Sequence, residues 1–227
     1  MTTAFELIAK TLSGRVPPRV LAWGLLNTLN RSFRTGNRRF EFERLYLEHP
    51  DPWSYLTSPY ERRKYERVLA CALKWRAGDK HALEVGCSVG VFSGMLAGHF
   101  KKVTSIDVSK EALAMATLHN QGTKNIHFIH RDLQTLETNE QYDVIVCSEV
   151  LYYIGEKDVD LVCRQLERYL SERGIIILVT GVATESADSF YFNEWENVFA
   201  ARFQQGFKEM VQDPMRAYLT AVFSRRA

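Results

Sequence analysis

HALEVGCSVG, from His81 to Gly90, decides the fold, because a short apolar run leads into a loop with two glycines and Val91 to His99 then reads as a helix. Gly86 can adopt backbone angles closed to other residues, and Gly90 lets the chain pass close to a bound ligand. Asp107 follows Gly90 by seventeen residues and ends the next apolar run. An acid at the carboxyl end of a second parallel strand is placed to bind two ribose hydroxyls. The stretch therefore predicts a site for an adenosine-type cofactor.

The details of the loop distinguish between cofactors. A dinucleotide fingerprint needs G-x-G-x-x-G, whereas this chain has G-C-S-V-G. With Glu84, the pattern E-x-G-x-x-x-G resembles the first motif of class I S-adenosylmethionine-dependent methyltransferases, with Ser88 in place of the usual middle glycine. A nicotinamide-dependent oxidoreductase is the alternative from another class, and the missing third glycine disfavours it.

Polar residues also follow two further apolar runs that read as parallel strands. Asn125 to His130 precede Asp132 and Leu133, and the continuous apolar run Tyr142 to Ser148 is typical of a strand buried on both faces. The end of this fourth strand carries Ser148, Glu149, Tyr152 and Tyr153. The methyltransferase resemblance implies that Asp132 accepts from the adenine amino group and that the backbone amide of Leu133 contacts a ring nitrogen.

The remaining pattern completes an α/β fold. We expect a helix over Glu156–Leu170, a strand from Gly174, a mostly helical segment over Ser186–Phe203, and strands over Phe207–Gln212 and Ala217–Arg225 joined by a turn at Asp213 and Pro214. Two final strands without a helix between them match the Rossmann-like, seven-stranded, mostly parallel sheet of class I methyltransferases, whose last strand is antiparallel.

Composition limits the class of protein. The 227 residues suffice for one α/β domain, which we place at 51–227 after an N-terminal helical extension over 1–50. The hydrophobic fraction of 46% and the charged fraction of 25% are ordinary for a globular protein. Four scattered cysteines and six histidines show no disulfide or metal-ligand spacing, so we expect no metal and a cytoplasmic location.

The N-terminal segment is strongly basic. Residues 1–40 hold seven Lys and Arg against Glu6 alone, which leaves +6 there and −4 in the rest of a chain of net charge +2. The apolar run near Trp23 is too short to span a bilayer and makes no convincing signal peptide. This segment could contact an anionic membrane surface or an acidic partner, or pack as a helical lid or dimer arm. Nucleic acid is disfavoured, because only this segment is basic and no Asn/Asp-Pro-Pro-Tyr motif follows the fourth strand.

The segment before the first strand carries the most specific resemblance. Ser58 and Glu61 have capping-box spacing, with Pro59 at the first helical position, and they predict a helix start. Together with DPW at 51–53, EVGCSVG and EVLYY, this region resembles the nodulation protein S family of S-adenosylmethionine-dependent methyltransferases over about Asp51 to Val179.

The resemblance implies N-methylation of the free amino sugar of a deacetylated chitooligosaccharide. It implies that Trp53 and Arg62 close over the cofactor, with Arg62 paired to its carboxylate. Glu149 could accept hydrogen bonds from the acceptor amine, while Tyr152 could shape its pocket. The expected cofactor-binding residues are Trp53, Arg62, Glu84, Gly86, Cys87, Gly90, Asp107, Val108, Asp132, Leu133 and Ser148.

Several interpretations stay open at this point. Trp53 could be a core aromatic, Arg62 a solvated helix residue, and Glu149 a turn cap. Tyr191, Asn193, Glu194 and Trp195 are candidates for a substrate wall by position alone. O-methylation of a small molecule or glycolipid is the alternative within the same chemistry, and a binding module without activity would be favoured if residues 1–50 blocked the acceptor pocket. The sequence sets neither the acceptor nor the oligomeric state.

Overall fold

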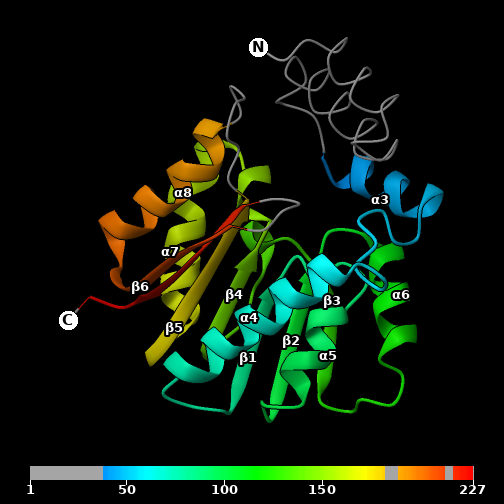
Figure 1. Cartoon of the computed structure of the whole chain (residues 1–227), viewed down its shortest axis with the longest axis horizontal. Helices are drawn as coiled ribbons and strands as arrows, with labels where there is room; N and C mark the ends of the chain where they lie inside the picture. The colour runs from blue at the N-terminus through cyan, green and yellow to red at the C-terminus, as the bar shows by residue number, and fades with distance from the viewer. Residues whose placement is uncertain (1–37, 182–188, 213–216, 227) are drawn as a thin grey trace.

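The computed structural model describes residues 38–181, 189–212 and 217–226, which form a seven-stranded sheet between two layers of helices (Figure 1). The strands are β1 (His81–Val85), β2 (Lys102–Asp107), β3 (Ile126–His130), β4 (Tyr142–Ser148), β5 (Leu170–Gly181), β6 (Gln204–Val211) and β7 (Tyr218–Ser224). Their order across the sheet is β3-β2-β1-β4-β5-β7-β6. Strands β1 to β5 pair in parallel, and β7 is antiparallel to both of its neighbours. The expected seven-stranded, mostly parallel sheet is confirmed.

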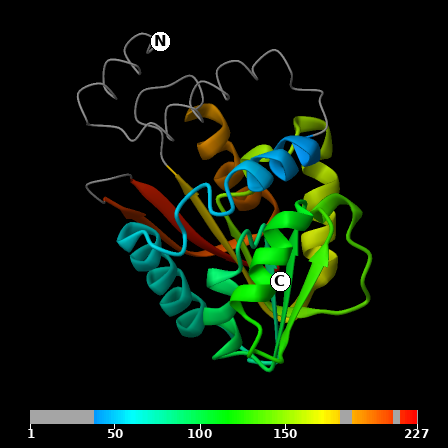
Figure 2. The same ribbon diagram turned by 90° about the vertical axis from the view of Figure 1, so that its right-hand side faces the viewer.

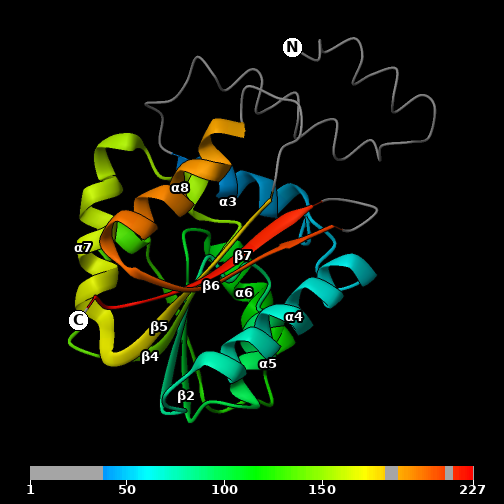
Figure 3. The same ribbon diagram turned by 60° about the vertical axis from the view of Figure 1, so that its left-hand side comes forward.

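Helices cover both faces of this sheet. The α-helices are α3 (Arg38–Glu48), α4 (Pro59–Trp75), α5 (Val91–Ala97), α6 (Lys110–His119), α7 (Val159–Tyr169) and α8 (Ser189–Arg202), and the short 3₁₀ turns are η2 (Leu133–Thr135), η3 (Leu151–Tyr153) and η4 (Glu156–Asp158). Figure 3 shows α7 and α8 on one side of the strands, with α4 and α5 on the other. The layered α/β/α arrangement places the carboxyl ends of the parallel strands along one edge.

Burial on both faces explains the unbroken apolar runs of the central strands. In β4, Ile145 and Cys147 pack into the core cluster that includes Leu166 of α7. Val144 and Val146 belong to the opposite cluster, which includes Val68 of α4. A strand with a core on each side needs apolar residues at every position, so alternation is absent.

The start of α4 follows the expected cap. Ser58 has an extended backbone, and its hydroxyl accepts a hydrogen bond from the Glu61 amide at 3.3 Å. Pro59 occupies the first helical position, where a missing N–H costs no helical hydrogen bond. The predicted helix start is confirmed.

Some element boundaries differ from the sequence expectation. The helix expected over Glu156–Leu170 is a 3₁₀ turn followed by α7, which ends at Tyr169. Strand β5 begins at Leu170 rather than at Gly174, because Leu170 pairs with Tyr142 and a register shift lets the strand continue. Helix α5 ends two residues early at Ala97, and β6 starts three residues early at Gln204. The expected turn at Asp213 and Pro214 lies outside the described residues.

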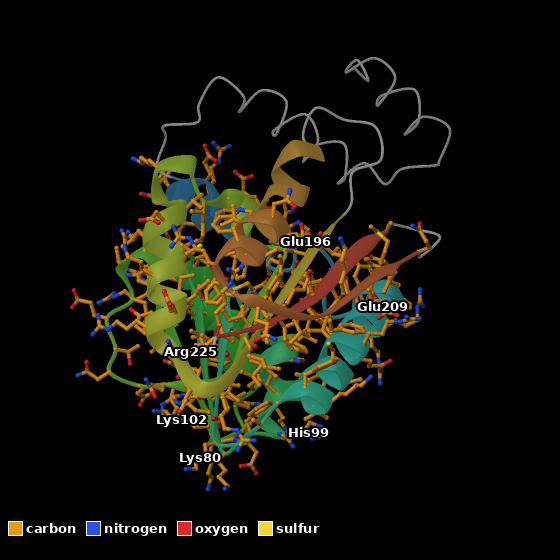
Figure 4. The ribbon with its side chains drawn as sticks, turned by 90° about the vertical axis from the view of Figure 1, so that its left-hand side faces the viewer. Lys80, His99, Lys102, Glu196, Glu209 and Arg225 are labelled. Carbon is orange, nitrogen blue, oxygen red and sulfur yellow. The ribbon has the colours of Figure 1, made fainter. Side chains whose placement is uncertain are left out.

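Helix α3 is the described part of the expected N-terminal extension, and it lies across the carboxyl ends of the strands, above α6 (Figure 2). Lys80, His99 and Lys102 lie at the opposite end of the sheet, where β1 and β2 begin (Figure 4). Residues 1–37 are outside the part that the structure describes. Among the helices of that part, none is both long and apolar enough to cross a membrane.

Candidate functional site

The two-glycine loop is held against the end of β2. The amides of Gly86 and Cys87 both donate to the carbonyl of Ile106, at 2.8 and 3.0 Å. Gly86 has φ +75°, and a Cβ there would lie 2.8 Å from Cγ2 of Val150. Both the backbone angle and the close contact with the segment after β4 therefore require glycine at Gly86.

Gly90 is required by backbone conformation and by packing. It has φ +74°, and a Cβ there would lie 2.8 Å from both the Ala116 Cβ and the Asn120 Nδ2 of the α6 region. The Asn120 side chain also donates to the Gly90 carbonyl at 3.0 Å. Close packing on α6 and a left-handed backbone both require glycine at this position.

Asp107 lies beside this loop at the end of β2. Its Oδ2 accepts from the Ser88 amide at 2.8 Å and its Oδ1 from the Ser109 amide at 3.0 Å, and the residue is 7% exposed. Burial raises the pKa of the Asp107 carboxyl, against the opposing effect of these amide hydrogen bonds. The carbonyl of Val108 accepts from His130 Nε2 at 2.9 Å, which ties the end of β2 to the end of β3. Asp107 is thus a buried, preoriented acceptor at the predicted position.

Two residues of the expected set, one in β1 and one in the loop, are buried. The Glu84 carboxylate accepts hydrogen bonds from Ser93 of α5 and Ser105 of β2, so it connects β1 to α5 and to β2. The Cys87 thiol is buried, and burial raises its pKa well above the ordinary range. A buried thiol held in its neutral form packs as a small apolar group.

Glu84 predicts a pH-dependent stability. Burial raises the pKa of Glu84 from 4.5 to about 7, although its bonds from Ser93 and Ser105 act in the opposite direction. Between these two values the folded chain keeps a proton that the unfolded chain has lost, so stability falls as pH rises and levels off above about pH 7. Glu84→Gln removes this ionisation and keeps an acceptor oxygen. We expect the variant to lose that slope and to melt a few degrees higher at pH 8, measured by scanning calorimetry beside the exposed control Glu172→Gln. Parallel melting curves at all pH values would contradict this assignment.

Asp132 is engaged within the protein. It caps η2, where its Oδ1 accepts from the Thr135 amide at 2.8 Å and from the Thr135 hydroxyl, and its Oδ2 forms an ion pair with Arg39 of α3. Burial alone would raise the pKa of the Asp132 carboxyl, but the bonds from Thr135 and Arg39 outweigh it and lower the value. Leu133 is buried in the adjacent core. An adenine amino group that bound Asp132 would have to share this carboxylate with Arg39 or displace Arg39 from it.

Helix α3 contacts the predicted site at three successive strand ends. The Tyr46 hydroxyl donates to Ser88 Oγ of the loop at 2.5 Å. Glu43 accepts from the Ser109 hydroxyl and the Lys110 amide, both at 2.7 Å, and Arg39 pairs with Asp132. Side chains from one face of α3 therefore cover the loop, the start of α6 and the end of β3.

Trp53 lies in an aromatic layer between α3 and the loop. Its ring centroid is 5.6 Å from that of Tyr46, 5.8 Å from that of Tyr55 and 6.4 Å from that of Phe42. It packs on the cluster that contains Val89 of the loop. The structure thus brings Trp53 to the loop, as part of a packed layer.

The end of β4 carries the predicted acceptor residues. Glu149 follows Ser148 with a left-handed φ of +56°, and its amide donates to the Val179 carbonyl at 2.9 Å. The Glu149 side chain is 8% exposed. The Tyr153 ring packs edge-on against Phe42 of α3 at 4.9 Å. The side chain of Tyr152 is not among those that the structure describes.

Arg62 does not approach the loop in this structure. Its side chain is 80% exposed, and its Nε pairs with Glu66 at 3.1 Å along the outer face of α4. The buried cation on α4 is Lys64, whose side chain is 3% exposed and whose Nζ lies 3.8 Å from Glu149 Oε1. Helical spacing explains why Lys64 and not Arg62 faces inward, because two residues along an α-helix rotate the side-chain direction by about half a turn.

The proposed substrate wall is only partly described. Trp195 is buried in the core against Phe199 of α8, with ring centroids 5.9 Å apart, so it is a packing residue and not a wall. The side chains of Tyr191, Asn193 and Glu194 lie outside those described.

Sequence reasoning missed the polar residues of α3 and the buried lysine of α4. Arg39, Glu43 and Tyr46 recur at intervals of four and three, which is the spacing of one helix face, and this was the available signal. Lys64 stands within the charged run ERRKYER, where Arg62 and Arg63 offer the same charge, and its available signal was its spacing of four and eight residues from the apolar Val68 and Ala72.

Comparison with known proteins agrees with this architecture. The family model for nodulation protein S (NodS) matches residues 37–184, more than half of the chain. Nodulation protein S of Bradyrhizobium diazoefficiens is 39% identical over 107 residues, 47% of this chain and 50% of that protein. The Rhizobium tropici protein of the same name is 33% identical over 132 residues, 58% of this chain and 55% of that protein. The matched segment thus spans about half the length of these relatives.

Solved structures share the fold. N-methyltransferase NodS from Bradyrhizobium japonicum WM9, in complex with S-adenosylhomocysteine, superposes with a TM-score of 0.71 at 22% identity, covering 84% of this chain and all of that one. Magnesium protoporphyrin IX methyltransferase from Synechocystis PCC 6803 with bound S-adenosylmethionine superposes with a TM-score of 0.66 at 15% identity, covering 85% of this chain and 99% of that one. The sheet is therefore that of the class I methyltransferases, and by the match over residues 37–184 the chain belongs to the nodulation protein S family.

Proposed function

We propose that this protein is an S-adenosylmethionine-dependent methyltransferase that methylates the amine of a small acceptor, such as an amino sugar. The observation that carries the proposal is the presence of two acids at the same edge of the sheet. Asp107 stands beside the two-glycine loop at the end of β2, and Glu149 stands at the end of β4. Family membership and the bound S-adenosylhomocysteine of a relative with the same fold support the same chemistry.

The residues present fit the adenosine part of the cofactor. Each oxygen of Asp107 accepts one backbone amide, from Ser88 and from Ser109. A carboxylate offers about four acceptor positions, so acceptor capacity for the ribose is left. Val89 and Trp53 supply an apolar layer next to this acid.

Glu149 supports the acceptor half of the proposal. S-adenosylmethionine supplies an activated methyl group, so that the N–C bond forms as the S–C bond breaks. The protein then has to align the amine lone pair and exclude water. An amine that arrives protonated must first lose its proton, and the Glu149 carboxylate would accept it. Packing of Tyr153 against Phe42 of α3 would shield this end of the site from solvent.

The proposal is tested by isothermal titration of the purified chain with S-adenosylhomocysteine, with NAD as the control. We expect micromolar binding of the former alone. A mixture with S-adenosylmethionine and a glucosamine oligomer should then yield N-methylated sugar. Binding of NAD, or of neither compound, would contradict the cofactor, and methylation of a fully N-acetylated oligomer would favour O-methylation instead.

A further inference from the structure

A buried group of three charges lies between the start of α4 and the end of β4. Lys64 Nζ is 2.7 Å from Glu61 Oε2 and 3.8 Å from Glu149 Oε1. The three side chains are 3%, 14% and 8% exposed, respectively, for Lys64, Glu61 and Glu149. Burial of an ion is costly unless it is paired, so the ammonium of Lys64 and these two carboxylates stabilise one another.

The surroundings of Lys64 are aromatic. Its Nζ lies 5.5 Å from the ring centroid of Tyr60 and 5.9 Å from that of Tyr65, within the range of cation–π attraction. The Tyr55 hydroxyl lies close enough to feel the charges of Glu61 and Glu149, which add to burial in raising the pKa of Tyr55 well above its ordinary value. Such walls exclude water, and charge interactions across this space are therefore stronger than at a surface.

The backbone fixes Glu149 at the cofactor loop. Its left-handed φ of +56° is costly for a residue with a side chain, and it is held by the hydrogen bond from its amide to Val179. The next residue, Val150, occupies the space that a Cβ on Gly86 would need. The backbone of Glu149 is thus held by β5 and by the contact of Val150 with the loop, and its carboxylate lies beside Lys64.

The first turns of α4 lie at the α3 end of the sheet in Figures 2 and 3. Lys64 therefore approaches the carboxyl end of β4 from α4, which belongs neither to the sheet nor to the cofactor loop. When all three groups are ionised, the cluster carries one net negative charge. That charge suits an arriving ammonium and gives no advantage to a neutral hydroxyl.

We propose that Lys64 is a positioning residue, whose ion pair directs the Glu149 carboxylate at the acceptor amine while Glu61 anchors the ammonium from the other side. This inference rests on the proposed function of the same site. It adds Lys64 and Glu61 of α4 to the residues at the strand ends that would select a cationic acceptor.

The test compares Lys64→Met with Lys64→Arg, and with the control Arg67→Met, which removes an exposed cation from the same helix. The measured quantities are the affinity for S-adenosylhomocysteine and the kcat and KM for a glucosamine oligomer. We expect Lys64→Met to lower kcat about tenfold, with cofactor affinity within about twofold, and Lys64→Arg to restore most of the rate. The control should match the unchanged chain.

A double-mutant cycle separates positioning from general stability. If Lys64 acts through Glu149, then Lys64→Met should cost less than about twofold in a Glu149→Gln background, because its partner charge is already gone. A full tenfold loss in that background, or a Lys64→Met rate equal to the control, would overturn the inference. Loss of cofactor affinity in Lys64→Met would also overturn it. An unchanged chain that binds no S-adenosylhomocysteine would instead refute the proposed function, before any variant is compared.

Discussion

Asp107→Ala should weaken binding of S-adenosylhomocysteine by about 100-fold or more, since hydrogen bonds to a charged group contribute about 1.5–3 kcal/mol each. The proposed ribose contacts would be lost together with the carboxylate. The same change leaves the amides of Ser88 and Ser109 without their acceptor, so the loop itself should loosen. Isothermal titration measures the first effect, and thermal unfolding measures the second.

The two effects of the Asp107 change can be separated. Asp107→Asn keeps the size of the side chain and an acceptor for one of the two amides, so it should unfold at a temperature between those of Asp107→Ala and the unchanged chain and still bind weakly. Asp79→Asn, at an exposed acid paired with Lys101, is the matched control and should change neither quantity. Unaltered cofactor affinity in a folded Asp107→Ala variant would place the cofactor elsewhere.

The sheet could be predicted because its signals are local. Apolar runs separated by glycine and acid residues identify strands without knowledge of their neighbours, and the bounds of β4 agree with the sequence expectation. Boundaries that depend on pairing could not be found this way. The start of β5 at Leu170 follows from its pairing with Tyr142, a residue 28 positions away in the chain.

The part of the site that depends on strand order could also be predicted from the sequence. Asp107 stands beside the loop as expected, because strand order alone brings β1 and β2 together. The cover of the site depends on tertiary packing instead. Arg39 reaches Asp132 across 93 residues of chain, and Lys64 differs from its neighbour Arg62 only in the face of α4 that it occupies. Charge alone does not decide which cation of such a run turns inward, whereas the spacing of Lys64 from Val68 and Ala72 places it on the buried face of α4.

Glu149→Gln should lower kcat by about 100-fold and leave the affinity for S-adenosylhomocysteine unchanged, because general-base and orienting groups contribute about 10²–10⁴ in rate. Glutamine has nearly the same shape, so the backbone at φ +56° and the bond to Val179 should persist. Glutamine has no negative charge that could attract the protonated acceptor amine or take its proton. Single-turnover methylation of a glucosamine oligomer measures the rate without interference from product release.

Glu209→Gln is the matched control, because Glu209 is an exposed acid on the edge strand β6 (Figure 4). It should turn over like the unchanged chain. If Glu149 only caps the turn after β4, then Glu149→Gln would be fully active, and the proton acceptor would have to be sought elsewhere at this edge. If the charge matters, the loss in Glu149→Gln should shrink as pH rises, because an acceptor amine that is already neutral needs neither attraction by Glu149 nor removal of its proton. A loss that is constant over pH would assign Glu149 to orientation alone.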